Sequence, residues 1–125
     1  MARTLKLFAC AVVILTYSVS AKADIESGQD IHDMCFGAGT FADDLKEVAE
    51  GVCWGFITGI GNVMISGHEV AGQNACAEGV GGPGGVSRGD MISTVKDYFA
   101  ANQDRLGRPA FVLVAEALGE AFPCE

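Results

Sequence analysis

The sequence predicts an all-α protein, a small disulfide-linked domain of four helices. In four segments, apolar residues recur at spacings of three and four, which is the period of one helix face. Several of these segments begin or end at capping or turn residues. No segment shows convincing alternation of apolar and polar residues, or β-branched enrichment bounded by turns, that would indicate strands.

The N-terminus has the pattern of a secretory signal peptide over residues 1–23. Arg3 and Lys6 precede an apolar run at 7–17, and Ala21-Lys22-Ala23 then matches an A-x-A cleavage site. The run is too short to span a bilayer comfortably. We therefore expect cleavage after residue 23 and export to the periplasm, with an uncleaved anchor as the alternative.

The mature domain, residues 24–125, is strongly acidic. Loss of the three basic residues in the signal leaves 5 basic and 16 acidic residues, a net charge of −11. Nucleic acid is an unsuitable partner for such a chain, because its affinity comes mostly from Lys and Arg on phosphates. A basic protein partner, or solubility alone, fits better.

Four cysteines remain after Cys10 leaves with the signal: Cys35, Cys53, Cys76 and Cys124. An even number in a small exported domain predicts two disulfides, and the spacing leaves all three pairings open. No two lie two to four residues apart, so we expect no metal site and no thiol-redox motif. No cofactor is expected.

The first two helices are separated by a short glycine segment. The first is predicted over 25–36, with Ile31, Met34 and Cys35 as its apolar stripe and Gly37 at its end. Thr40 and Asp43 resemble a capping box that opens the second. The apolar positions of the second helix are Leu45, Val48, Ala49, Val52, Cys53, Phe56, Ile57, Ile60 and Met64.

Gly51, Gly55 and Gly59 lie on one side of this second helix, where another backbone could pack closely. Residues 51–67 carry no charge, so a membrane span is the alternative. However, glycines and polar residues dilute the hydrophobicity, and the flanks lack the Lys and Arg of a stop-transfer segment. We expect helix packing at the three glycines and no membrane span in the mature chain.

Residues 66–86 carry seven glycines and one proline, which predicts a loop. Ser87 and Asp90 form the next capping box. The third helix has the inner face Met91, Ile92, Val95, Tyr98 and Phe99, and the fourth, after Pro109, has Phe111, Val114, Ala115, Leu118 and Phe122.

No grouping of residues predicts catalysis. His32-Asp33-Met34-Cys35 matches a phospholipase A2 string, but its adjacent half-cystine pair is missing and the glycine-rich loop follows it instead of preceding it. The glycines before Ser87 lack the Lys-Ser/Thr of a phosphate loop. We therefore interpret His32 as a surface residue beside Asp33, and a small hydrolase that uses His32 is the remaining enzyme hypothesis.

Two stretches, CWGFITGI in the second helix and residues 86–124, resemble the Rap/Tai family of type VI secretion immunity proteins. The shared features are a Cys-x-Gly-aromatic-x-x-Gly helix, a GVT-like helix start, a V-x-x-Y-L stretch and a terminal A-L-x-x-A-F-P-C. This resemblance covers about half of the mature chain.

The resemblance implies an HdeA-like exported helical domain that binds an amidase toxin, blocks its cleft and often forms a homodimer. It also implies disulfides Cys35–Cys76 and Cys53–Cys124. Two features depart from the family pattern: the segment after Cys76 is longer, and Asn102-Gln103 replaces His-Pro.

The predicted partner-binding residues lie in the exposed, irregular segment 69–88: Glu69, Glu78, Gly79, Val80, Gly82, Pro83, Gly84 and Arg88. The alternative function is an HdeA-like acid-stress chaperone, since 16 carboxylates could drive a pH switch. Two disulfides would restrain the unfolding that such a chaperone exploits.

Overall fold

The computed structural model describes residues 25–37, 41–76 and 85–124; the predicted signal peptide lies outside these ranges. They form four α-helices and a single 3₁₀ turn, with isolated bridges but no strand in this part of the chain. The all-α prediction is confirmed. The helices are α2 (Gly28–Phe36), α3 (Asp43–Ile65), α4 (Arg88–Ala101) and α5 (Ala110–Ala121), with η2 (Gln103–Arg105) between the last two.

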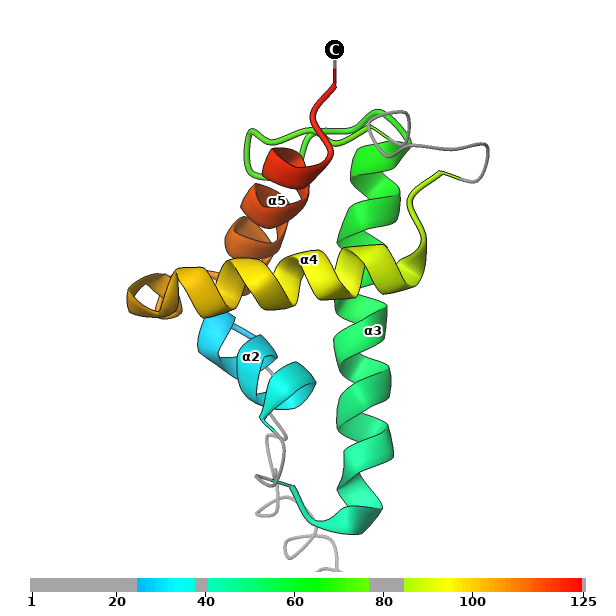
Figure 1. Cartoon of the computed structure of the whole chain (residues 1–125). Helices are drawn as coiled ribbons and strands as arrows, with labels where there is room; N and C mark the ends of the chain where they lie inside the picture. The colour runs from blue at the N-terminus through cyan, green and yellow to red at the C-terminus, as the bar shows by residue number, and fades with distance from the viewer. Residues whose placement is uncertain (1–24, 38–40, 77–84, 125) are drawn as a thin grey trace, which may run out of the picture.

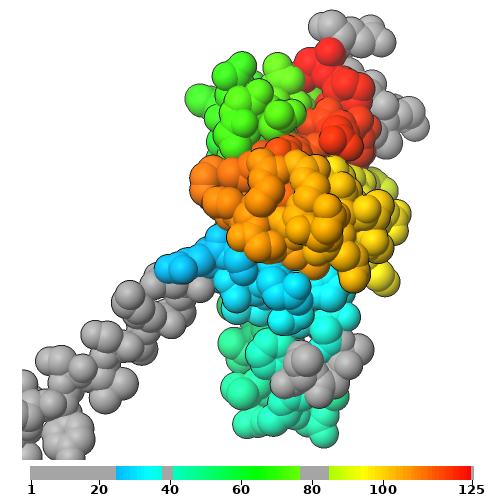
Figure 2. All heavy atoms as spheres, turned by 90° about the vertical axis from the view of Figure 1, so that its left-hand side faces the viewer, coloured from blue at the N-terminus to red at the C-terminus, as the bar shows by residue number. Residues whose placement is uncertain are grey.

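The long helix α3 forms one side of the domain (Figure 1). α2 and α5 lie beside it, one below the other in this view, and α4 crosses in front of all three. Each helix contacts the other three. The N-terminal turns of α3 extend beyond the rest of the packed domain (Figure 2).

α2 begins at Gly28 because Ser27 caps it. The Ser27 backbone N–H donates to the Asp30 carboxylate at 2.9 Å, and the Asp30 N–H donates to Ser27 Oγ at 3.3 Å. The bond from the Ser27 N–H, together with one from the Ser27 hydroxyl to the same carboxylate at 2.9 Å, holds the pKa of Asp30 below its usual value. The helix was expected to start three residues earlier, and it ends at Gly37 as predicted.

α3 begins at Asp43, with Ala42 as its N-cap residue. The predicted capping box is therefore wrong for Asp43, which lies one residue, not three, beyond the cap; Thr40 lies outside the described residues. The Asp43 carboxylate instead accepts a hydrogen bond from Lys46 Nζ at 2.6 Å. An acidic residue in the first turn still favours the helix through its dipole.

The core is built from the buried faces of all four helices. The predicted inner face of α4 is confirmed, with Met91, Val95 and Phe99 fully or almost fully buried. On α5 the prediction holds except at Phe111, which is 48 % exposed. The buried apolar residues are Ile31, Ala49, Cys53, Ile57, Met64, Ala75, Met91, Val95, Phe99, Leu106, Ala110, Leu113, Val114, Ala115, Ala117, Leu118 and Phe122.

The predicted apolar stripe of α3 is only half buried. Its Cys53, Ile57 and Met64 face the core, whereas Val48 is 61 % exposed and Leu45 and Val52 are also exposed. The predicted helix is present, but these three outer residues are not covered because the apolar positions of α3 extend around more of its circumference than its neighbours do.

The glycine prediction was also wrong within this chain. A Cβ added at Gly51, Gly55 or Gly59 would have no described neighbour within 4 Å. The glycine that permits close packing is Gly61, where a Cβ would lie 2.5 Å from Met91 Sδ. Each interior helix glycine costs about 1 kcal/mol relative to alanine, and packing inside the domain does not offset that cost at the three exposed positions.

α3 is long and apolar enough, by length and composition, to cross a membrane. Only 28 % of its most apolar stretch is buried in the domain. Its buried face nevertheless belongs to the common core and packs on α4 and α5 through Gly61. The helix is therefore part of the packed domain and also presents a long uncovered face.

Both expected disulfides are present, but with a different pairing. Cys35 bonds Cys53 and Cys76 bonds Cys124, with Cα atoms 5.2 and 5.0 Å apart. The pairing implied by the family resemblance was wrong, because α2 packs against α3 and so places Cys35 beside Cys53. The segment after α3 returns across the end of α5, where the Cys76 N–H donates to the Phe122 carbonyl at 2.9 Å.

A charged network fixes the turn between α4 and α5. Glu116 accepts hydrogen bonds from Tyr98 Oη at 2.8 Å, Arg105 Nη2 at 2.6 Å and Arg108 Nη1 at 3.0 Å. Burial alone would raise the pKa of Glu116, but the bonds from Arg108 and Tyr98 and the charge of Arg105 outweigh burial and lower it. Burial, followed by the bond to Glu116, raises the pKa of Tyr98.

Candidate functional site

The segment predicted to bind a partner is anchored at both of its described ends. On one side, the Cys76–Cys124 disulfide joins it to the end of α5. Asn74 also packs there, since a Cβ at Gly119 would lie 3.2 Å from its carbonyl oxygen. The segment 77–84 therefore starts from a fixed point on the core.

On the other side, Ser87 caps α4. The Ser87 N–H donates to the Asp90 carboxylate at 2.8 Å and the Asp90 N–H donates to Ser87 Oγ at 3.1 Å, so the predicted capping box is confirmed. The Ser87 side chain and its backbone N–H, both acting on the carboxylate, lower the pKa of Asp90. Glu69 and Arg88 are exposed, and the other six predicted contact residues, Glu78, Gly79, Val80, Gly82, Pro83 and Gly84, lie outside the described residues.

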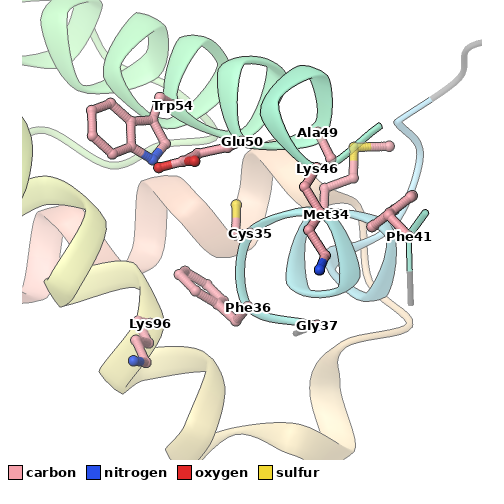
Figure 3. Close-up of a pocket in the computed structure, with 10 residues that line it drawn as sticks. All are labelled: Met34, Cys35, Phe36, Gly37, Phe41, Lys46, Ala49, Glu50, Trp54 and Lys96. Atoms are coloured by element: carbon pink, nitrogen blue, oxygen red, sulfur yellow. The ribbon is translucent and has the colours of Figure 1, made fainter. Parts of the chain in front are cut away.

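A cleft of about 480 Å³ opens close to Arg88, between α2, α3 and α4 (Figure 3). The end of α2 contributes Cys35 and Phe36, α3 contributes Trp54, and Lys96 comes from α4. We call this the α2–α3–α4 cleft, and its lining residues are Met34, Cys35, Phe36, Gly37, Phe41, Lys46, Ala49, Glu50, Trp54 and Lys96.

Local folding explains how these side chains meet. The Cys35–Cys53 disulfide pins the last turn of α2 to the middle of α3. Phe36 packs edge-on against the buried ring of Phe99 in α4, with ring centroids 6.4 Å apart. The disulfide and the contact between the two rings therefore fix the floor of the cleft, while its charged residues lie at the rim.

Three of the five basic residues of the domain gather around this cleft. Of the five that follow residue 23, Arg105 and Arg108 are bound to Glu116. The other three are Lys46 and Lys96, which line the cleft, and Arg88, whose guanidinium lies 5.9 Å from the centre of the Trp54 ring. In so acidic a protein, this concentration of positive charge marks one surface as different from the rest.

Acidic groups partly offset this charge. Glu50 lines the same cleft, and Asp43 bonds Lys46 near its rim. Lys96 has no ion pair with a described residue. The cleft therefore combines apolar walls with one ammonium group, Lys96, and one carboxylate, Glu50, which suits an apolar protein segment that places an acidic group at Lys96.

Neither histidine completes a catalytic group with described residues. His32 Nδ1 lies 3.2 Å from Asp33, as predicted, and its ring packs against Phe36. Ser66 Oγ lies 3.2 Å from His68 Nδ1 at the exposed end of α3, but its hydroxyl donates to the Val63 carbonyl. The described part of the chain likewise has no group of three His, Cys, Asp or Glu side chains placed to hold a metal.

A second hollow, almost entirely apolar and about 190 Å³ in volume, lies beside the cleft. It runs along the exposed N-terminal half of α3 and is lined by Met34, Phe41, Leu45, Val48, Ala49 and Val52. Sequence reasoning missed both hollows. The signal available for the cleft was Lys46 and Lys96, two of only five basic residues after residue 23, to which no role was assigned.

The model of the Rap1a immunity proteins matches residues 27–124, which is nearly the whole described domain. This chain belongs to the Rap1a immunity protein family. The match spans α2 to α5 and all four disulfide cysteines. A comparison with curated proteins found no significant match.

The family assignment gives the geometry a context. Rap1a proteins are immunity proteins, so the expected activity is recognition of another protein rather than chemistry on a substrate. A rigid domain with an anchored loop and an adjacent lined cleft is a structure suited to such recognition.

Proposed function

We propose that this Rap1a protein is a periplasmic immunity protein that binds a peptidoglycan amidase toxin of a type VI secretion system and blocks its active-site cleft. The family match over residues 27–124 is the observation that carries the proposal. The signal-like N-terminus and the two disulfides support export, because disulfides persist in oxidising compartments. The protein acts by binding, without catalysis of its own.

The toxin-binding surface is the segment 69–88 together with the rim of the α2–α3–α4 cleft. The segment leads directly into Arg88, and Arg88 stacks on Trp54 at the cleft. A segment anchored at both ends loses less conformational entropy on binding than one attached loosely. The free Lys96 would attract acidic groups of the toxin at the same surface.

Co-expression with candidate secreted amidases tests this function. The wild-type protein restores growth when the cognate toxin is directed to the periplasm, and a variant lacking residues 79–85 does not, provided that it still folds. Failure of every toxin encoded beside this gene to be neutralised would contradict the proposal.

A charge reversal tests whether the cleft contributes to toxin binding in addition to the loop. Lys96→Glu should weaken toxin binding by at least about 10-fold, because it places a carboxylate at the one free ammonium position. Glu120→Lys, on the exposed surface of α5, is the matched control and should leave binding unchanged. Titration calorimetry at two salt concentrations measures both variants, and equal affinities would remove the cleft from the proposed surface.

We also propose that the protein is a homodimer. The uncovered face of α3 supports this part of the proposal, because large exposed apolar surfaces usually mark a site of association.

A further inference from the structure

The exposed face of α3 has the residue spacing of a helix-pairing seam. The positions fall alternately three and four residues apart, which is the a/d pattern of a coiled coil, and all of them are exposed. We call them the α3 stripe: Leu45, Val48, Val52, Gly55, Gly59 and Asn62. The stripe runs along the side of the helix opposite Cys53, Ile57 and Met64, which face the core.

The two halves of the α3 stripe differ in shape. The N-terminal half carries Leu45, Val48 and Val52, all at least 40 % exposed. The C-terminal half carries Gly55 and Gly59, where an added Cβ would have open space. Side chains protrude from the first half, whereas the second half exposes the helix backbone.

We propose that a second copy of this chain covers the α3 stripe, with the two α3 helices antiparallel and a two-fold axis between Val52 and Gly55. In that arrangement Val52 of each copy faces Gly55 of the other, and Val48 faces Gly59. Each protruding valine thus enters a position without a side chain. A single register of the two helices forms both pairs and also places Leu45 opposite Asn62. The same surface of each copy therefore fits the other, as a two-fold interface requires.

The charges of α3 favour the same direction. Asp43, Asp44, Glu47 and Glu50 all lie in its N-terminal third, and residues 51–65 carry no charge. Parallel pairing would bring the two acidic ends together. Antiparallel pairing places each beside an uncharged half, and separates the centres of the two acidic ends by about 22 Å along the helix axis, compared with a screening length of about 8 Å at physiological ionic strength.

The apolar hollow on α3 extends the interface. Its walls include Leu45, Val48 and Val52 of the stripe together with Met34 and Phe41. The hollow therefore continues the seam beyond the helix itself. A second copy would close it with the C-terminal half of its own α3, which includes Val63, 46 % exposed.

The seam also explains two of the three exposed glycines, Gly55 and Gly59. Glycine lowers helix stability relative to alanine, and nothing inside the domain requires it at Gly51, Gly55 or Gly59. Glycines at a spacing of four allow two helix backbones to approach closely. A partner backbone outside the chain gives Gly55 and Gly59 the role that packing within the chain does not.

The inference specifies the surface for the proposed homodimer and rests on that part of the proposed function only. Sedimentation equilibrium of the mature full-length protein should give twice the chain mass at micromolar concentration. Gly59→Leu should raise the dimer dissociation constant at least about 30-fold, the scale of an interface hot spot. It should not lower the thermal stability of the monomer, because the new side chain enters open space.

Gly107→Leu is the matched control. This glycine also has open space around a Cβ, but it lies in the turn before α5 and away from the stripe. The control should remain dimeric. A monomeric wild-type protein, or Gly59→Leu as fully dimeric as Gly107→Leu, would overturn the inference.

Cysteine pairs test the direction. The double variant Val48→Cys with Gly59→Cys should form a covalent dimer on mild oxidation, because these positions face each other across the antiparallel seam. Neither single variant should cross-link, whereas a parallel pair would link the single variants instead. Cross-linking of the single variants, or α3 embedded in membranes with no soluble dimer, would also overturn the inference.

A growth-protection assay distinguishes failure of the dimer inference from failure of the proposed toxin binding. A dimer with the predicted cross-links that neutralises no toxin would leave this inference standing and would contradict only the toxin-binding function. If Gly59→Leu instead abolished toxin binding by a protein that is monomeric on its own, the toxin would be the occupant of the stripe and the inference would be wrong.

Discussion

At the scale of single residues, two positions in this domain have little freedom to change. Gly28 begins α2 against the turn before α5, and its N–H donates to the Arg108 carbonyl at 2.9 Å. Glu116 pairs with Arg105 and Arg108 from the same turn and accepts a hydrogen bond from Tyr98 of α4. Gly28 joins segments that are far apart in the sequence, and Glu116 joins α5 to α4 and to the turn between them, so their effects on stability should exceed those of neighbours with similar exposure.

Gly28→Ala should destabilise the protein by about 1–3 kcal/mol, the usual cost of overpacking. The added Cβ would lie 3.1 Å from the Leu106 carbonyl oxygen and would collide with Leu113 Cδ1, and the backbone atom cannot move aside cheaply. Gly89→Ala, in the first turn of α4, is the control; its Cβ would lie 3.7 Å from Ser87 Oγ, which is ordinary contact. Urea unfolding measures both, and equal midpoints would contradict the account of α2 packing.

Glu116→Gln should lower the free energy of unfolding by about 2 kcal/mol, because it removes the charge that pairs with Arg105 and Arg108 in a partly buried site. Glu120→Gln, exposed on the same helix, should change it by less than about 0.5 kcal/mol. Chemical denaturation followed by circular dichroism gives both values. A Glu116 variant as stable as the Glu120 variant would show that the network contributes little.

At the scale of elements, the disulfides have separate tasks. Cys35–Cys53 closes an 18-residue separation and holds α2 to α3, while Cys76–Cys124 spans 48 residues and holds the segment after α3 to the end of α5. The first fixes the floor of the α2–α3–α4 cleft. The second fixes the starting point of the proposed toxin-binding segment.

Removal of each bridge should therefore have a different result. Replacement of Cys35 and Cys53 by serine should cost about 3 kcal/mol, and replacement of Cys76 and Cys124 about 4 kcal/mol, because the longer loop restricts the unfolded chain more. Hydrogen exchange should increase locally in residues 66–76 only for the second pair. Mass spectrometry of unreduced peptides checks the pairing itself, and a Cys35–Cys76 peptide would contradict the structure.

At the scale of the whole molecule, periodicity and capping residues predicted the four helices, but not which face of α3 is covered. Ser87 and Asp90 marked the start of α4 correctly because a capping box is a local arrangement. Leu45 and Val48 belong to the same apolar pattern as Cys53 and Ile57, and hydrophobic periodicity cannot distinguish a face buried inside the chain from one left exposed. The disulfide pairing and the α2–α3–α4 cleft depend on contacts between α2 and α3, which residue spacing alone does not contain.

The stability of the whole domain should fall as the solution becomes acidic. Asp30, Asp90 and Glu116 all have pKa values lowered in the folded state, so the unfolded chain binds more protons at low pH. Their contribution is fully present above the unfolded carboxylate pKa of about 4, and is lost as the pH falls through the lower folded values. The midpoint temperature of thermal unfolding should thus be nearly constant from about pH 7 to 5 and should fall below about pH 4.

Glu116→Gln tests how much of this loss of stability comes from the charged network at Glu116. The variant should be less stable at pH 7 and should lose less on acidification, so that the two curves converge at low pH. The Glu120→Gln control should follow the wild type throughout. Parallel curves for the wild type and the Glu116 variant would mean that this carboxylate keeps the same pKa on unfolding, and the acid sensitivity would then belong to the two helix caps at Asp30 and Asp90.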